Sequence, residues 1–174
     1  MAGVSRVLKD ALGSKVKVFL ADPPGSVLTS YVQSGGTLKE RSGGSITEGI
    51  GQGRVTDNMK QEIGLMDDAF TIPDEKSIEM VYRLLDEEGL YMGASSALNV
   101  CAAAEMAQKL GKGSKVVTIL CDAAYRLVKT FRLTSKLLTV ILRYQTRLFS
   151  KKWLASKGLT EAIPTELRKY AVLD

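Results

Sequence analysis

The chain has 174 residues, of which 45% are hydrophobic and 25% are charged, as expected for a globular domain with a buried core. It contains no histidine, which excludes Ser-His and Cys-His nucleophile pairs, histidine bases and histidine-ligated metals. We therefore expect no metal site. No stretch approaches the roughly 20 apolar residues of a membrane helix, so we expect no membrane association.

The net charge of +5 is confined to the end of the chain. Residues 126–174 hold 11 basic and 3 acidic residues, against 13 and 16 in residues 1–125. This basic segment has little aromatic interleaving and matches no nucleic-acid-binding module, so we expect no nucleic-acid partner.

Both cysteines lie within apolar runs. Cys101 is in LNVCAAA and Cys121 is in VVTILCDAA. Such thiols usually behave as small buried hydrophobic groups, so we predict that both are buried and free. The spacing matches neither a disulfide framework nor a zinc site, and it favours a reducing compartment.

Helical and strand patterns alternate along the first part of the chain. Residues 2–13 have helical apolar spacing and end at a glycine, whereas the apolar run KVKVFLADP resembles a buried parallel strand. The segments that follow are a turn with a short helix (23–36), a glycine-rich loop (42–55), a short helix (57–66) and a short strand (68–74).

The second part continues the alternation. We predict a helix from Asp74 to Gly89, because acidic residues open it and its apolar residues share one face. A second helix follows the GASS turn and ends at Gly111, and SKVVTILCD (114–122) has the clearest strand pattern in the chain. This order predicts a three-layer α/β fold with a mainly parallel sheet, whose ligands bind beyond the carboxyl ends of the strands.

Three loops on that edge are candidate ligand sites. The glycines of EGIGQG (48–53) are typical of an ordinary mobile loop, or of backbone that lines a flat or anionic ligand. In GASSALNV, spacing alone favours helix capping by Ser95 or Ser96, with a hydroxyl presented to a ligand as the alternative. Asp122, directly after VVTILC, is either a turn residue or part of a site.

An ordered set of motifs resembles the carboxyl half of cysteine synthases and cystathionine β-synthases. In chain order these are AGVSRVLK, VFLADPPGS, EGIGQG, VYRLLDEEGLYMGASSALNV, VVTILCDAAYR and RLFSKKWLASKGL. The resemblance implies the tryptophan synthase β-like fold of enzymes that use pyridoxal 5'-phosphate (PLP), here incomplete. It further implies β-replacement on an activated serine, a small amino-acid substrate and a homodimeric parent enzyme.

The resemblance also assigns roles to residues. Ser95 matches the serine that hydrogen-bonds the pyridine nitrogen of PLP, a neutral partner that suits elimination and replacement chemistry. Gly49, Ile50 and Gly51, together with Glu48, match a loop that lies close to the cofactor. Asp122 matches the end of the last strand, although the Pro-Asp usual in the family is Cys-Asp in this chain.

Other parts of the family's site have no counterpart in the sequence. The Schiff-base lysine, the substrate-carboxylate loop and the G-T-G-G-T phosphate cradle would all precede Met1, so we predict no catalytic residue and a truncated gene model. We expect this chain alone to bind PLP weakly or not at all and to be inactive. Any targeting segment would be lost as well, which leaves cytoplasmic and mitochondrial locations open.

Residues 127–142 have no counterpart in the family and contain no acidic residue. We interpret them as an insertion, either a translated intron or a genuine amphipathic segment. The predicted organisation is then an α/β region (1–126), the insertion (127–142) and a carboxyl-terminal helix and tail (143–174). Two rival functions remain, a noncatalytic module that pairs with a full-length relative and a nucleotide-binding domain, for which no phosphate loop is present.

Overall fold

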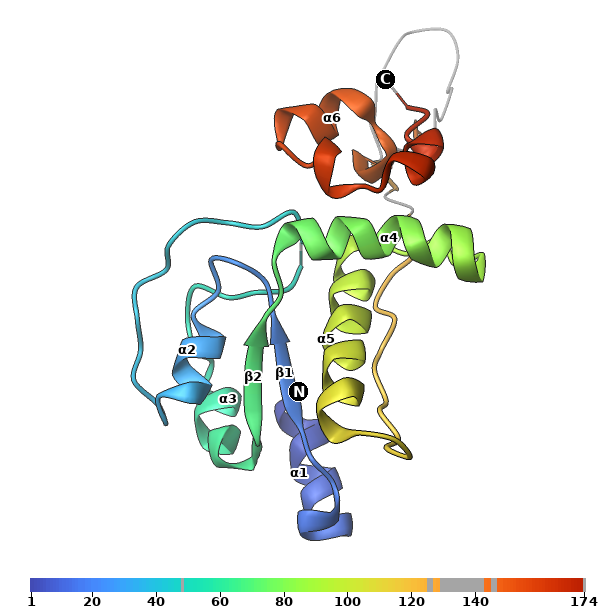
Figure 1. Ribbon diagram of the computed structural model, residues 1–174. Helices are drawn as coiled ribbons and strands as arrows, with labels where there is room; N and C mark the ends of the chain where they lie inside the picture. The colour runs from blue at the N-terminus through green and yellow to red at the C-terminus, as the bar shows by residue number, and fades with distance from the viewer. Residues whose placement is uncertain (48, 125–126, 129–142, 145–146, 174) are drawn as a thin grey trace, which may run out of the picture.

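The computed structural model describes residues 1–47, 49–124, 127–128, 143–144 and 147–173. Helices and strands alternate along most of this part of the chain (Figure 1). In chain order they are α1 (Ala2–Leu12), β1 (Phe19–Asp22), α2 (Leu28–Gln33), α3 (Asp57–Glu62), β2 (Asp68–Thr71), α4 (Asp74–Glu88), α5 (Ala94–Leu110), β3 (Leu127–Val128), β4 (Arg143–Tyr144) and α6 (Lys151–Ser156).

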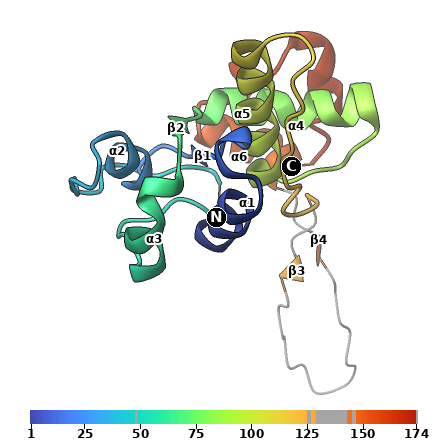
Figure 2. The same cartoon turned by 90° about the horizontal axis from the view of Figure 1, so that it is seen from below.

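Strands β1 and β2 form a parallel pair between two layers of helices (Figures 1 and 2). Successive side chains of a strand point to opposite faces of the sheet. Leu20 and Ala69 accordingly join the apolar cluster with α2 and α3, whereas Ala21 and Phe70 pack against the cluster with α5. The predicted three-layer α/β arrangement with a parallel sheet is confirmed.

Local sequence signals set the ends of α4 and α5. Asp74 and Glu75 occupy the first turn of α4, where carboxylates complement the helix dipole. Gly89 ends α4 in the left-handed conformation at φ 67°, and Gly111 ends α5 at φ 83°. Both predicted helix ends are confirmed.

The carboxyl-terminal segment packs on α4 through the largest apolar cluster of the structure (Figure 1). Tyr82 of α4 is fully buried in this cluster, and its hydroxyl donates a hydrogen bond to the carbonyl of Leu148 at 3.0 Å. The ring of Phe149 lies 4.9 Å from that of Tyr82 and 5.0 Å from that of Tyr91. This contact joins residues 147–173 to the α/β layers.

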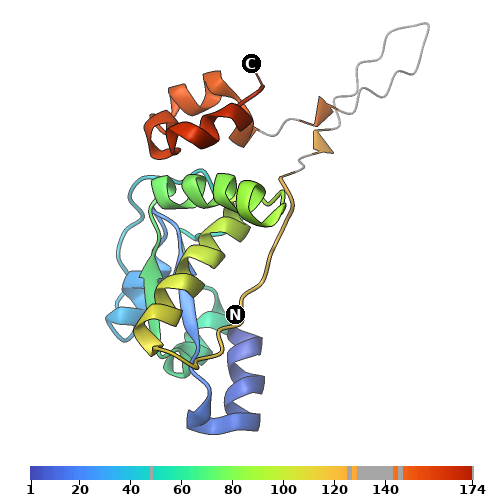
Figure 3. The ribbon, with the colours of Figure 1, turned by 45° about the vertical axis from the view of Figure 1, so that its right-hand side comes forward.

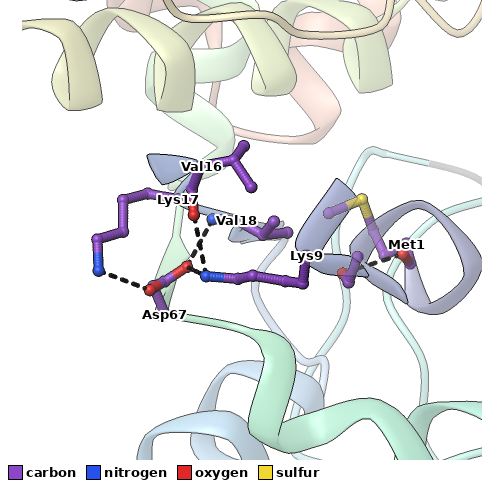
Figure 4. A network of polar contacts seen from close by, with 7 residues as sticks. Met1, Lys9, Val16, Lys17, Val18 and Asp67 are labelled. Carbon is purple, nitrogen blue, oxygen red and sulfur yellow. Dashed lines mark hydrogen bonds and ion pairs between the residues drawn. The ribbon is translucent and has the colours of Figure 1, made fainter. Parts of the chain in front are cut away.

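An ionic network joins α1 to the start of the sheet (Figure 4). Asp67 accepts hydrogen bonds from Lys9 at 2.7 Å, from Lys17 at 3.1 Å and from the backbone amide of Val18 at 2.7 Å. Lys9 also donates to the carbonyl of Val16. The network fixes the amino-terminal helix beside the point where β1 begins.

The strand predicted over residues 114–122 is wrong. The segment is extended, but the structure pairs it with no described strand, and its side chains are exposed. A strand forms only where a neighbour supplies hydrogen bonds, and a local apolar pattern cannot specify that neighbour. Cys121 lies on this segment and is exposed, so the prediction that it is buried is also wrong, whereas Cys101 is buried as predicted.

The predicted insertion lies largely outside the described residues. Its flanks are described only at β3 and β4, which pair antiparallel with Leu127 opposite Tyr144. The three-part organisation of the chain stays a prediction. None of the described helices is both long and apolar enough to cross a lipid bilayer.

Candidate functional site

Two of the predicted site residues meet at the start of α5. The hydroxyl of Ser95 donates to a carboxylate oxygen of Asp122 at 2.8 Å. Ser96, which is fully buried, donates to the Asp122 carbonyl at 2.8 Å and accepts from the Asp122 amide at 3.0 Å. The GASS turn and the residue after VVTILC are therefore held together, although 27 positions separate Ser95 from Asp122.

Neither serine caps α5, so the capping interpretation favoured by spacing is wrong. The residue before the helix is Gly93, and no side chain accepts a hydrogen bond from the first-turn amides. The hydroxyls of Ser95 and Ser96 instead contact Asp122. Asp122 is distant from both serines in the sequence, so the local pattern could not indicate this contact. Ser95 is only 6% exposed, so its orientation is fixed by packing as well as by this hydrogen bond.

Gly93 is needed because Asp122 lies directly against it. A Cβ atom at this position would lie 2.5 Å from both carboxylate oxygens of Asp122. The Gly93 amide donates to the Asp122 carbonyl at 3.2 Å, and the neighbouring Ala124 amide donates to the carbonyl of Tyr91. These contacts fix the carboxylate at the amino end of α5.

The glycine-rich loop packs closely against the turn that follows β1. Gly49 and Gly51 have φ values of 92° and 78°, a region that favours glycine. A Cβ on Gly51 would lie 2.4 Å from the ring of Pro23. The amide of Val27 donates to the carbonyl of Gln52 at 2.9 Å, so backbone contacts position this loop.

The same loop approaches α5 through Ile50. This side chain packs against the buried cluster of Ile72, Leu98 and Cys101, and Leu98 lies one turn beyond the start of α5. The structure thus brings the predicted residue Ile50 to the α5 side of the sheet, while the neighbouring Gly51 packs against Pro23 in the turn after β1. Glu48 lies outside the described residues.

Asp74 holds the other end of the loop, a role that the sequence analysis missed. One of its carboxylate oxygens accepts a short hydrogen bond from Ser45, and the other accepts from the amide of Ile46 at 2.9 Å. Ser45 also contacts Thr47 at 2.8 Å. The sequence identified Asp74 only as the start of a helix, and nothing in the local pattern identified its partners 28 and 29 positions away.

Replacing Asp74 with alanine is expected to lower the free energy of unfolding by about 1–2 kcal/mol, because two partners lose their acceptor. Hydrogen exchange of residues 43–47 should speed up more than exchange in α5. The matched control is Asp57→Ala, since Asp57 also opens a helix but its side chain is 89% exposed. Equal exchange in the two variants would show that Asp74 does not fix the loop.

Asp22 is a second missed residue, placed at the carboxyl end of β1. It is 2% exposed and accepts hydrogen bonds from the amide and hydroxyl of Thr29, at 3.0 and 3.2 Å. Burial raises the pKa of its carboxyl group, and the hydrogen bonds oppose that shift only in part. The sequence offered the same signal as at Asp122, a carboxylate directly after an apolar run.

Asp22 and Asp67 are expected to affect stability in opposite directions as the pH changes. Burial opposes ionisation of Asp67, but hydrogen bonds from Lys9, Val18 and Lys17 outweigh it and lower its pKa. Its stabilising contribution is present above the unfolded-state pKa of about 3.9 and lost as the pH falls through the folded-state value. The pKa of Asp22 is raised, so its stabilising contribution is present below the unfolded-state pKa. That contribution is lost as the pH rises through the folded-state pKa of Asp22.

The check is a pH series of unfolding free energies for the wild type, Asp67→Asn and Asp22→Asn. The stability difference between wild type and Asp67→Asn should shrink below about pH 4. The difference between wild type and Asp22→Asn should shrink above about pH 4. Parallel curves for the two variants would contradict the assignment.

The comparisons with known proteins show the family of the chain. The family of pyridoxal-phosphate dependent enzymes matches residues 1–122, and the chain belongs to this family. It is 62% identical over 173 residues to cysteine synthase 1 of Emericella nidulans, and 62% identical over 172 residues to cysteine synthase 1 of Neurospora crassa. These alignments cover 99% of the chain but 42% and 41% of the two relatives, so the chain spans about two-fifths of their length.

A solved structure supports the fold. The crystal structure of an O-acetylserine dependent cystathionine β-synthase from Helicobacter pylori matches with a TM-score of 0.59 and 31% identity. The match covers 70% of this chain and 36% of that chain. The family and fold implied by the sequence motifs are confirmed.

Proposed function

We propose that this chain is part of a PLP-dependent, cysteine synthase-like enzyme and that it supplies the wall of the site facing the pyridine ring. The observation that carries the proposal is the fixed Ser95 hydroxyl at the start of α5, held by Asp122 at 2.8 Å. The names of the relatives support cysteine synthesis as the parent reaction, and the family resemblance implies that it proceeds by β-replacement on an activated serine. PLP, when bound, would supply electron withdrawal from the reacting amino acid.

The described residues fit one side of such a site. Ser95 would contact the ring nitrogen, and Gly49 and Gly51 would offer backbone in a conformation that admits close approach. An unprotonated ring nitrogen accepts a hydrogen bond, so the Ser95 hydroxyl, which donates to Asp122 at 2.8 Å in the structure, would donate to that nitrogen in place of Asp122 when the ring is bound.

The residue that binds PLP covalently would come from the part of the enzyme outside this chain. No lysine of this sequence stands in the motif that binds PLP covalently, so the chain is proposed to be inactive alone. The parent enzyme is proposed to act on a small amino acid, to form a homodimer and to work in the cytoplasm or in mitochondria.

Ultraviolet-visible spectroscopy tests this proposal. PLP added to the purified chain should give only the spectrum of free cofactor. Co-expression with the part of E. nidulans cysteine synthase 1 that lies outside the match should give a protein-bound band. A band from the chain alone, abolished by replacing one particular lysine, would refute the proposed incompleteness.

A second candidate function is a noncatalytic module that pairs with a full-length relative. The observation in its favour is the exposed apolar side chains of α1, including Val7 at 65% and Leu12 at 49%. Such a module would become more stable when mixed with an intact relative, whether or not PLP is present. An unfolding temperature that does not change with added relative would count against it.

A further inference from the structure

The ring of Phe149 packs beside the turn that carries Ser95. Phe149 is 3% exposed, and its ring stacks on that of Tyr91, with 5.0 Å between the ring centroids and 25° between the planes. Tyr91 lies two positions before Gly93, the residue that precedes α5. A residue of the carboxyl-terminal segment therefore contacts the approach to the candidate site, although the two are far apart in the sequence.

Backbone hydrogen bonds lead from Tyr91 to the contact between Ser95 and Asp122. The carbonyl of Tyr91 accepts from the amide of Ala124 at 3.1 Å. The amide of Gly93 donates to the carbonyl of Asp122 at 3.2 Å. The backbone on either side of Asp122 is thus tied to the turn beside Tyr91, and the Asp122 carboxylate accepts from the Ser95 hydroxyl.

The apolar cluster around Phe149 also reaches other parts of the candidate site. It includes Ala97 near the start of α5 and Ala124 just after Asp122, and Ile46 of the glycine-rich loop packs against it. Both α5 and the segment that ends at Ala124 meet α4 at this cluster (Figures 1 and 3). Because protein interiors are close-packed, a change of side-chain volume at Phe149 is transmitted to these neighbours.

Hydrogen bonds near the end of the chain fix the backbone of Phe149. Its carbonyl accepts from the amide of Leu173 at 3.0 Å, and the amide of Lys151 donates to the carbonyl of Leu173 at 2.8 Å. The ring also lies 4.9 Å from that of Tyr82. The orientation of the Phe149 ring against Tyr91 is therefore set by both backbone and side-chain contacts.

We infer that Phe149 is a positioning residue for the Ser95–Asp122 contact, which it holds in place through the ring and backbone of Tyr91. Its value to a cofactor site rests on the proposed function, whereas the contact itself needs no cofactor. A purely structural role would stabilise all parts of the chain alike. A positioning role requires that loss of the ring loosens the candidate site more than it loosens α5.

The test is amide hydrogen exchange of the purified chain, followed by nuclear magnetic resonance, in the wild type, Phe149→Leu and Leu167→Ala. Leu167 is the matched control, since it is 6% exposed, belongs to the same cluster and lies in the short helix Thr165–Tyr170, which packs on α4. Both substitutions remove buried apolar volume, so both should speed up exchange that requires global unfolding.

The two variants should differ at the candidate site. In Phe149→Leu, the amides of Gly93, Asp122 and Ala124 should exchange about three- to tenfold faster relative to amides in the middle of α5, as expected for loss of an aromatic pair. In Leu167→Ala this ratio should change less than about 1.5-fold. An unchanged ratio in Phe149→Leu, or an equal rise in Leu167→Ala, would overturn the inference.

Substitutions of Tyr91 test the path of the coupling. Tyr91→Phe keeps the ring and should keep the exchange ratio of the wild type, whereas Tyr91→Leu should raise it as Phe149→Leu does. The double variant Phe149→Leu/Tyr91→Leu should exchange little faster than either single variant, because both remove the same contact. Multiplied effects in the double variant would show that Phe149 does not act through Tyr91.

The outcomes separate this inference from the proposed function. The exchange experiments contain no PLP, so their failure would overturn the inference and leave the proposed function standing. In the co-expressed complex, Phe149→Leu should shift the absorbance of bound PLP as Ser95→Ala does, because it loosens the turn that carries Ser95, whereas Leu167→Ala should not. Wild-type absorbance in Phe149→Leu would contradict the positioning role, and a wild-type complex without a PLP band would contradict the proposed function alone.

Discussion

Replacing Tyr82 with alanine is expected to lower the free energy of unfolding by about 3–5 kcal/mol. The side chain is fully buried, contacts the ring of Phe149 and donates to the carbonyl of Leu148. Removing the ring leaves a cavity between α4 and the carboxyl-terminal segment, and the freed carbonyl loses its donor. Denaturant unfolding measures the loss, and exchange in residues 147–173 should speed up most.

The conservative variant Tyr82→Phe separates the hydrogen bond from packing. It keeps the ring and should lose only about 1 kcal/mol. Burial raises the pKa of Tyr82, so the hydroxyl stays protonated and remains a donor across the accessible pH range. Two variants that lose equal stability would show that the ring contributes little to the contact between α4 and the carboxyl-terminal segment.

Ser96→Ala is expected to lower the free energy of unfolding by about 2–3 kcal/mol, because its hydroxyl partners both the amide and the carbonyl of Asp122. Without it the Asp122 amide would lose its partner at the end of α5, and the Asp122 carbonyl would keep only the hydrogen bond from the Gly93 amide. Ser95→Ala should cost about 1 kcal/mol, since its hydroxyl contacts only the carboxylate. The two serines are adjacent and both buried, so each serves as the control for the other.

A double-mutant cycle checks the Ser95 contact directly. If the hydrogen bond is formed, Ser95→Ala and Asp122→Ala should be non-additive by about 0.5–1.5 kcal/mol. Additive effects would show that the two side chains do not interact. A smaller loss for Ser96→Ala than for Ser95→Ala would contradict the contacts assigned to the buried serine.

Local patterns predicted the elements whose signals lie within them. Periodic apolar residues and terminal glycines placed α4 and α5, and short apolar runs placed β1 and β2. The pattern at 114–122 failed because the strand state depends on a neighbour that VVTILC cannot specify. Cys121 was misplaced for the same reason, since it was expected to share the burial of that strand.

In the candidate site, local patterns likewise identified single residues but not the contacts between distant residues. Ser95 and Asp122 were each predicted for the ligand edge, but their contact links residues that are distant in sequence. Family resemblance supplied their roles, and residue pattern alone had favoured a helix cap at Ser95. Asp74 was missed because its loop partners are equally distant in the sequence. Asp22 was missed although it is a carboxylate directly after an apolar run, the same pattern that singled out Asp122.

The measurement that most directly tests the central claim is the PLP affinity of the chain co-expressed with the remaining part of E. nidulans cysteine synthase 1. Ser95→Ala should weaken PLP binding about tenfold by losing a hydrogen bond to the ring, and should change the absorbance of the bound cofactor. The control Ser156→Ala removes an exposed hydroxyl of α6 that bonds only locally, and should bind PLP as the wild type does. Unchanged affinity and spectrum in Ser95→Ala would contradict the claim that this chain supplies the wall facing the pyridine ring.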